Sequence, residues 1–282
     1  MTTTLRPTGP LQESADGTRF RAYEVCVNSR PVGAVSVGTD PGFGRRVGTI
    51  SGLRVDEADR RRGRATVAAL AAEEVLRGWR CELVRVSVPA GATVALHLAR
   101  TLGYTERSRS LAKDLPPDAA AWYGSPMRPM TQEEYDRWRA AAEDAYARTW
   151  RERGVPEEAA EAKSRADHAA LLPDGFGTEG AVFRVAEDPD GRTVGWLWAG
   201  LRGETGDPAG RLTYVWDVHV AEETRGRGYG RALMSHAEWI AREEHGTDRL
   251  GLHVFTDNTP ALRLYESLGY RPAEYHFDKR LL

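Results

Sequence analysis

The sequence predicts an α/β protein of the α+β type, built from two related units. Segments 53–65 and 218–230 align at an offset of 165 residues, and the Leu-Gly-Tyr tripeptides 102–104 and 268–270 align at an offset of 166. Around each copy, several strand-like runs precede one amphipathic helix, an order typical of a sheet covered by helices. An internal repeat on this scale indicates that one fold occurs twice in the chain.

Length and charge also favour two domains. At 282 residues the chain exceeds one average domain. Up to Ser125 it has 18 Lys and Arg residues against 13 Asp and Glu, and after Ser125 it has 21 against 28. We place the first domain at residues 1–113, a proline-containing linker at 114–126, and the second domain at 127–282.

The first unit begins with three strands, predicted at 20–28, 31–38 and 47–55. An Ala-rich helix follows at 65–77, and another apolar strand is predicted at 83–88. A short helix and a final strand complete this unit.

The second unit repeats the same order, with strands predicted at 181–187, 193–201, 212–220 and 249–255. Its main helix is predicted at 229–244, where four apolar residues share one face: Leu233, Ala237, Ile240 and Ala241.

The second unit has further predicted helices, one near its end and two before its first strand. A short helix near its end has Thr259 as the expected N-cap, Pro260 at the first helical position and Gly269 after the last turn. Two helical patterns at 131–150 and 156–172 precede its first strand and have no counterpart in the first unit.

Several classes of protein are disfavoured. No run approaches the roughly 18 apolar residues of a spanning helix, and the first residues lack a signal-peptide core, so we expect a cytoplasmic protein without a membrane partner. Cys26 and Cys81 form no CxxC pair and the histidines show no HExxH spacing, so we expect buried thiols and no metal. The net charge of −2 makes nucleic acid an unlikely partner.

A glycine-rich loop at 225–230 lies between a predicted strand and the main helix of the second unit. Glycines 226, 228 and 230 let the backbone approach a ligand closely, and the free N–H groups of a helix N-terminus bind anions. The loop lacks the Gly-Lys-Ser/Thr of a Walker loop, and Arg231 stands where a dinucleotide fingerprint has glycine. The pattern therefore indicates a phosphate-binding loop of another kind.

Two motifs together resemble one family. The first is R-x-x-G-x-G at 225–230, and the second is N-x-x-A-x-x-L-Y-x-x-x-G at 258–269. In this order, with a strand between them, they are similar to the GNAT superfamily of acyl-CoA-dependent N-acyltransferases. The resemblance covers nearly all of residues 127–282.

The resemblance implies a mixed, mostly antiparallel twisted sheet flanked by helices, whose central strands splay apart around the pantetheine arm of coenzyme A. It also implies acetyl-CoA as co-substrate, with a phosphate loop that holds the pyrophosphate. The residues that it assigns to cofactor binding are Val218, Val220, Arg225, Gly226, Arg227, Gly228, Tyr229, Gly230, Arg231, Asn258 and Ala261.

The resemblance also implies direct transfer to an amine, with Tyr265 as the general acid that protonates the departing thiolate. The base that deprotonates the amine is open. His253 is the first candidate, since histidine titrates near neutral pH, and Asp217 and His219 are rivals. Asp217 is alternatively a site for a cationic substrate amine.

Four aromatic residues on the preceding strands have two readings, either as the lining of an acceptor pocket or as packing within the sheet. They are Trp196, Trp198, Tyr214 and Trp216.

The first unit keeps the loop pattern R-x-x-G-x-A at 60–65 but lacks the candidate catalytic and cofactor-binding residues of the second unit. Ala99, Ala92 and Ser87 stand where the second unit has Tyr265, Asn258 and His253. We therefore interpret residues 1–113 as a degenerate GNAT-like domain.

The sequence predicts an N-acetyltransferase acting on a primary amine of a small molecule or peptide. A non-catalytic acyl-CoA-binding or regulatory protein is the alternative, and nucleic-acid binding by the basic first half is a weaker one. The acceptor, the acyl-chain length and the oligomeric state stay open, because no portable motif encodes them.

Overall fold

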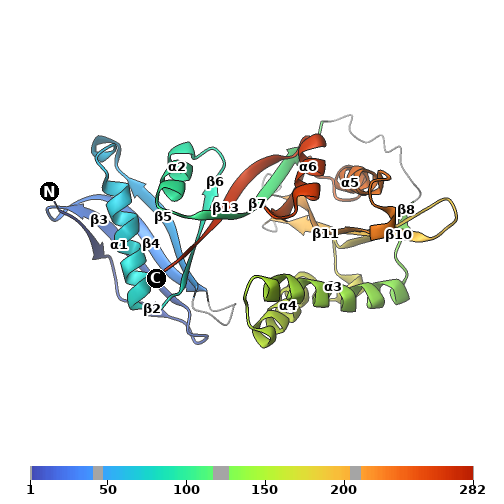
Figure 1. Ribbon diagram of the computed structural model, residues 1–282, viewed down its shortest axis with the longest axis horizontal. Coiled ribbons are helices and arrows are strands. Elements are labelled where there is room, and N and C mark those ends of the chain that lie inside the picture. Colours follow the sequence, from blue (N-terminus) through green and yellow to red (C-terminus); the bar gives the residue numbers. More distant parts are fainter. Residues whose placement is uncertain (1, 41–46, 117–126, 204–210, 282) are drawn as a thin grey trace. The chain divides into compact units, whose positions relative to one another are not determined.

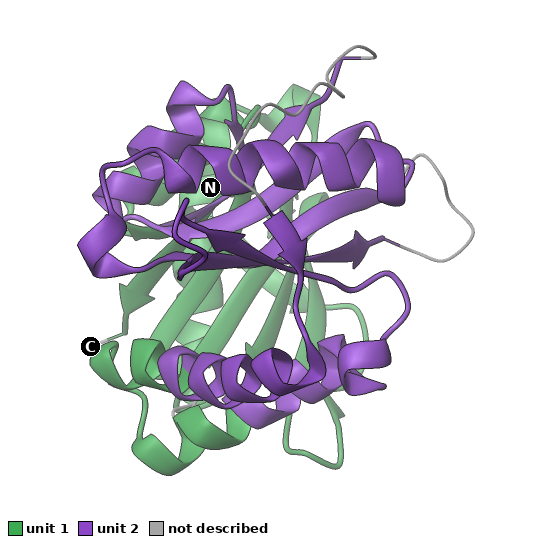
Figure 2. Ribbon diagram, turned by 90° about the vertical axis from the view of Figure 1, so that its right-hand side faces the viewer, with its two compact units in different colours: residues 1–107, 147–163, 274–282 green, residues 108–146, 164–273 purple. Residues whose placement is uncertain are grey.

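The computed structural model describes residues 2–40, 47–116, 127–203 and 211–281. These form two compact units (Figure 2), unit 1 with residues 1–107, 147–163 and 274–282, and unit 2 with residues 108–146 and 164–273. The predicted domains 1–113 and 127–282 follow the repeat in the sequence and stay a prediction. The compact units differ from them because each contains a final strand that comes from the other repeat.

The sheet of unit 1 has six strands in the order β1-β3-β4-β5-β6-β13, and β2 also pairs with β3. Its elements are β1 (Thr3–Pro7), β2 (Gln12–Glu13), β3 (Arg19–Val27), β4 (Arg30–Asp40), β5 (Val47–Val55), η1 (Glu57–Asp59), α1 (Arg64–Gly78), β6 (Leu83–Pro89), α2 (Thr93–Thr101) and β13 (Arg271–Arg280). Only β5 and β6 are parallel, and they pair through three residues each. Ala68, Ala72 and Leu76 of α1 pack against the sheet and form its core.

Unit 2 has the strand order β7-β12-β11-β10-β9-β8. Its elements are β7 (Thr105–Asp114), β8 (Met127–Pro129), α3 (Gln132–Glu152), α4 (Glu157–Leu171), η2 (Gly175–Gly177), β9 (Val182–Glu187), β10 (Thr193–Arg202), β11 (Leu212–Val220), η3 (Glu222–Thr224), α5 (Tyr229–Trp239), η4 (Ile240–Glu244), β12 (Arg249–Phe255) and α6 (Thr259–Ser267). The end of α3 and the start of α4, residues 147–163, belong to unit 1. Helices α5 and α6 cover one face of the sheet, and α3 and α4 lie on the other face (Figure 1).

The expected mixed, mostly antiparallel sheet with splayed central strands is confirmed in both units. The parallel central pairs end early, after Thr49 and Arg85 in unit 1 and after Val215 and Leu252 in unit 2. The predicted apolar face of the main helix is confirmed too, since its four residues are fully buried. Both cysteines are buried as expected.

Two local predictions were wrong. The N-cap of α6 is Asn258, not Thr259, because the Asn258 Oδ1 accepts a hydrogen bond of 3.3 Å from the Ala261 N–H. The main helix is α-helical only to Trp239, and residues Ile240–Glu244 form a π-helical turn. No helix in the described ranges has the length and hydropathy of a membrane span.

Each unit holds its final strand with a cluster of one glutamate, one tyrosine and one lysine. In unit 1 the Lys279 ammonium lies 2.8 Å from both carboxylate oxygens of Glu73, and the Tyr104 hydroxyl donates to Glu73 at 3.0 Å. Glu73 is 1% exposed, so the ion pair satisfies a charge that water does not reach.

Unit 2 contains the equivalent cluster. The Lys113 ammonium lies 2.7 Å from Glu238, and the Tyr270 hydroxyl donates to Glu238 at 3.4 Å. The two clusters match at the offsets of the repeat, but each lysine lies on a strand from the other repeat. Each exchanged strand is therefore held in place by side-chain contacts as well as by backbone pairing.

We expect Lys279→Met to destabilise the protein by about 3 kcal/mol, because it leaves the buried Glu73 carboxylate with only the more distant Arg77, 4.0 Å away, as a counterion. The double variant Lys279→Met with Glu73→Gln is expected to recover most of this loss, since the glutamine still accepts from Tyr104. Urea unfolding measures both. A single variant as stable as the wild type contradicts the role given to this ion pair.

Candidate functional site

The open edge of β11 is the central feature of unit 2. β11 pairs with β12 only from Thr213 to Val215, and a bulge opposite Trp198 and Ala199 makes Trp216 an extra residue. The Ala221 N–H donates to Val194 of β10 at 2.8 Å, so by strand alternation the backbone groups of Val218 and Val220 face away from β10. Apart from the Val220 carbonyl, which accepts a weak bond from Arg225, these groups are open to a ligand beside the strand.

The glycine-rich loop leads from this edge into α5. Gly226 and Gly228 have φ of +78° and +90°, and no heavy atom lies within 4 Å of a Cβ at either position. No side chain caps α5, and its first backbone bond is the 3.0 Å bond from Ala232 N–H to Gly228 C=O. The N–H groups of the first turn are thus free to bind an anion, as a pyrophosphate requires.

Several predicted cofactor residues have structural partners. The Arg225 Nε donates weakly to the Val220 carbonyl at 3.4 Å, and the Arg231 guanidinium donates to Ser267 of α6 at 2.9 Å. Gly230 lies against α6, where an added Cβ would be 3.1 Å from Leu264. These contacts join the loop to β11 and α6.

Arg227 is exposed in the loop, and Tyr229 and Ala261 pack partly buried on the core beneath α5 and α6. Asn258 caps α6, which orders the turn between β12 and that helix. The loop and this turn therefore adjoin the same core, although the two motifs are separated in the sequence.

Asp217 lies on the open part of β11 and is held by two indoles. Its Oδ2 accepts from Trp196 Nε1 at 2.7 Å and from Trp138 Nε1 at 3.1 Å. Trp196 belongs to the neighbouring strand β10, whereas Trp138 belongs to α3 on the face opposite α5. The carboxylate therefore has a fixed position at the junction of the sheet and α3.

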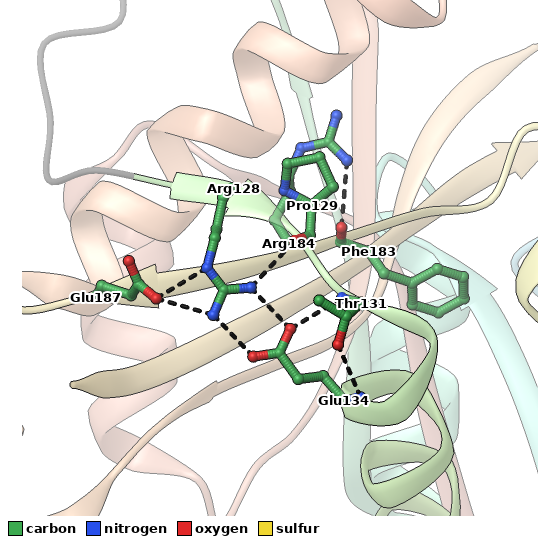
Figure 3. A network of polar contacts seen from close by, with 7 residues as sticks. All are labelled: Arg128, Pro129, Thr131, Glu134, Phe183, Arg184 and Glu187. Carbon is green, nitrogen blue, oxygen red and sulfur yellow. Dashed lines mark hydrogen bonds and ion pairs between the residues drawn. The ribbon is translucent and has the colours of Figure 1, made fainter. Parts of the chain in front are cut away.

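The start of α3, which sets the position of Trp138, is anchored by the polar network of Figure 3. Thr131 and Glu134 form a capping box, with bonds of 3.2 Å and 2.9 Å between their side chains and each other's backbone N–H. The Arg128 guanidinium binds both oxygens of Glu134, at 2.7 Å and 2.8 Å, and also Glu187 of β9. These bonds lower the pKa of Glu134 to about 2, with Arg128 as the main cause.

His219 follows Asp217 by two residues and lies on the same side of β11. Its ring stacks on Trp196, with centroids 4.1 Å apart and planes 14° apart. Burial lowers the pKa of His219, Asp217 opposes that shift, and Arg225 adds to it. A lowered pKa favours the neutral imidazole, which is the form that accepts a proton.

His253 lies on β12 and is exposed. Its neighbours Leu252 and Val254 are buried in the core beneath α5, so His253 points toward the opposite face of the sheet. Its ring meets Phe255 edge-on at 5.4 Å. His253 and Asp217 are thus on the same side of the sheet, the side of α3.

Tyr265 of α6 is 6% exposed and meets the ring of Tyr270 edge-on at 5.9 Å. Burial raises the pKa of Tyr265 to about 12, and the negative charge of Asp217 acts in the same direction. The phenol therefore keeps its proton at neutral pH and feels the carboxylate on β11.

The four aromatic residues for which pocket lining and sheet packing were the alternatives differ in burial. Trp198 and Tyr214 are buried packing residues, whereas Trp196 and Trp216 are only partly buried. Sequence reasoning missed Trp138, whose only signal was a tryptophan on the apolar face of a predicted helix. Among the described residues, no group of three His, Cys, Asp or Glu side chains is placed to hold a metal ion.

Unit 1 keeps the loop backbone. Gly63 precedes α1 with φ of +72°, and Arg61 takes the place of Gly226 with φ of +59°. Arg60 Nε donates to the Val55 carbonyl at 2.9 Å, as Arg225 does to Val220. Arg64 of this loop is buried in an ion pair with Asp59.

The remaining equivalents in unit 1 carry no comparable chemistry. Ala99 is a buried core residue, and Ala92 precedes α2 without a side-chain cap. The Ser87 hydroxyl is hydrogen-bonded to His276 Nδ1 at 2.8 Å.

Comparison with known proteins agrees with this fold. The family model described as the acetyltransferase (GNAT) family matches residues 4–104 and 132–270. The chain therefore belongs to the GNAT acetyltransferase family, and both repeats are members of it.

Two curated relatives illustrate the match. A mycothiol acetyltransferase of Salinispora arenicola is 29% identical over 248 residues, which are 85% of this chain and 74% of the relative. The uncharacterized N-acetyltransferase YdgE of Bacillus subtilis is 29% identical over 158 residues, which are 54% of this chain and 95% of the relative.

Two solved structures share the fold over most of this chain. A GCN5-related N-acetyltransferase from Sphaerobacter thermophilus aligns with a TM-score of 0.59 at 22% identity, over 92% of this chain and 80% of that chain. A tandem GNAT protein from the clavulanic acid biosynthesis pathway aligns with a TM-score of 0.53 at 19% identity, over 95% and 85%. At these identities the likeness establishes the fold alone.

The network at the start of α3 makes a pH-dependent contribution to stability. Because the pKa of Glu134 falls from its usual value of 4.5 to about 2, its contribution is full above about pH 4.5 and disappears as the pH falls toward 2. We expect Glu134→Gln to lower the free energy of unfolding at pH 7 and to match the wild type near pH 2. Urea unfolding across this range measures it, and a pH-independent difference contradicts the assignment.

Proposed function

We propose that the chain transfers an acetyl group from acetyl-CoA directly to a primary amine of a small molecule or peptide. The observation that carries this proposal is the placement of the buried phenol of Tyr265 near the open part of β11, where its pKa responds to Asp217. The family membership supports acyl transfer in general, and the geometry of unit 2 supports this particular form of it.

The loop and the open edge of β11 suit acetyl-CoA. The uncapped N-terminus of α5, with Gly226 and Gly228 open on the ligand side, would hold the pyrophosphate. The outward backbone groups of Val218 and Val220 would pair with the amide groups of pantetheine. Acetyl-CoA supplies a thioester carbonyl that a neutral amine attacks.

In the transfer, the C–N bond forms as the C–S bond breaks, and the coenzyme leaves as a thiolate. Tyr265 donates its proton to that sulfur, which the raised pKa permits because the phenol stays protonated at neutral pH. The proton that the amine loses goes to a base on the α3 side of the sheet. His253 and His219 are the candidates there, and Asp217 is the third.

We expect Tyr265→Phe to lower kcat by about 100-fold while the affinity for acetyl-CoA is unchanged, because only proton donation is lost. The measurement is release of CoA with an amine acceptor, together with titration calorimetry of acetyl-CoA. Tyr146→Phe is the matched control, since it removes a hydroxyl that binds Asp167 in the helical pair. Binding of acetyl-CoA without turnover of any amine by the wild type supports the non-catalytic alternative instead.

The pyrophosphate site is tested by a pair of charge reversals at equivalent positions of the two loops. Arg227→Glu is expected to weaken acetyl-CoA binding by at least about tenfold, because it places a negative charge beside the phosphates. Arg62→Glu makes the same change in the first repeat without introducing a strained backbone, since neither position has positive φ. Calorimetry compares them, and an equal loss in Arg62→Glu shows that the first repeat binds the ligand.

A further inference from the structure

Asp217 has an unusual charge environment. Both of its hydrogen-bond donors are neutral indoles, and they bind the same oxygen, Oδ2. Among the described residues, no lysine, arginine or histidine forms an ion pair with this partly buried carboxylate. A charge in such a position is costly unless a cation accompanies it.

The side chains around Asp217 leave no cation of the protein to fill this role. Trp196 and Trp138 bind the carboxylate, and the stacked His219 has a lowered pKa and is neutral near pH 7. Arg202 lies over the ring of Tyr214, 4.7 Å from its centroid, and forms no ion pair with Asp217. Among the described residues, therefore, none supplies the countercharge, which leaves that role to a ligand.

The two indole donors fix Oδ2 of Asp217, and no hydrogen bond from a described residue reaches Oδ1. A carboxylate held in this way attracts an ammonium or guanidinium group through its second oxygen. The aromatic rings beside it favour the same ligand, since cations bind well to indole faces.

We propose that Asp217 binds a cationic group of the acceptor that is not the nitrogen to be acetylated, so that the acceptor is a short dibasic amine. A nitrogen held as an ammonium ion has no lone pair with which to attack, and the reacting nitrogen must therefore be a second one. Because the acceptor is the second substrate of the proposed transferase, the proposal rests on that function. It gives Asp217 a role in substrate choice in place of proton transfer.

The test compares two amines of equal chain length that differ only in the second cation, putrescine and butylamine. We expect the wild type to prefer putrescine in kcat/KM, and Asp217→Asn to reduce that preference by about ten- to a hundredfold through KM. Asparagine keeps the size of the side chain and an acceptor for the indoles. Asp190→Asn, in the exposed turn between β9 and β10, is the control for loss of one negative charge.

Calorimetric titration of putrescine into the protein saturated with CoA provides a second readout. If putrescine binds to the wild type but not to Asp217→Asn, and neither amine is turned over, the cation site is supported and the transferase proposal fails. Turnover with an unchanged preference in Asp217→Asn overturns the cation site and leaves the transferase standing. An equal fall of kcat for both amines makes Asp217 a proton-transfer group and overturns the proposal, as does the absence of both binding and turnover.

Discussion

The early end of the pairing between β11 and β12 is the constraint on which the site of unit 2 depends. Beyond Val215 the backbone of β11 has a partner on one side only, and buried peptide groups without partners are costly. A ligand with amide groups satisfies them as a neighbouring strand would. The same early end between β5 and β6 shows that this geometry belongs to the repeat itself, whereas Tyr265 distinguishes the second copy.

A chain of contacts transmits the position of α3 to the site. Arg128 joins the first turn of α3 to β9, and Trp138, seven residues after Thr131 of the capping box, reaches Asp217 on β11. Tyr265 approaches from α6 on the other helical layer, and its pKa depends on the same carboxylate. Asp217 thus contacts the α3 side of the sheet through Trp138 and influences the phenol of Tyr265 on the other side. The helical pair that contributes Trp138 is also the part that the first repeat lacks.

Local patterns predicted much of this. The glycines at 226 and 228 predicted the loop because they occupy conformations with positive φ, and the apolar spacing of α5 predicted its buried face. The contact of Trp138 with Asp217 spans 79 residues of sequence, so no local pattern encodes it. The cap of α6 was misplaced by one residue because Asn258 and Thr259 both favour such positions, and only the bond to Ala261 distinguishes them.

The exchange of final strands was equally hidden, because β7 and β13 are equivalent in the repeat and either would satisfy the pattern. Their lysines bind equivalent glutamates, so the ion pairs alone do not determine which strand ends which sheet. In this chain the connections between successive elements decide that β13 ends the sheet of unit 1 and β7 the sheet of unit 2. The sheet that carries Asp217 and His253 ends in β7, a strand of the first repeat, with Ser110 opposite His253. The first repeat therefore contributes a strand to the sheet of the second, even though alanine and serine stand where the second repeat has Tyr265 and His253.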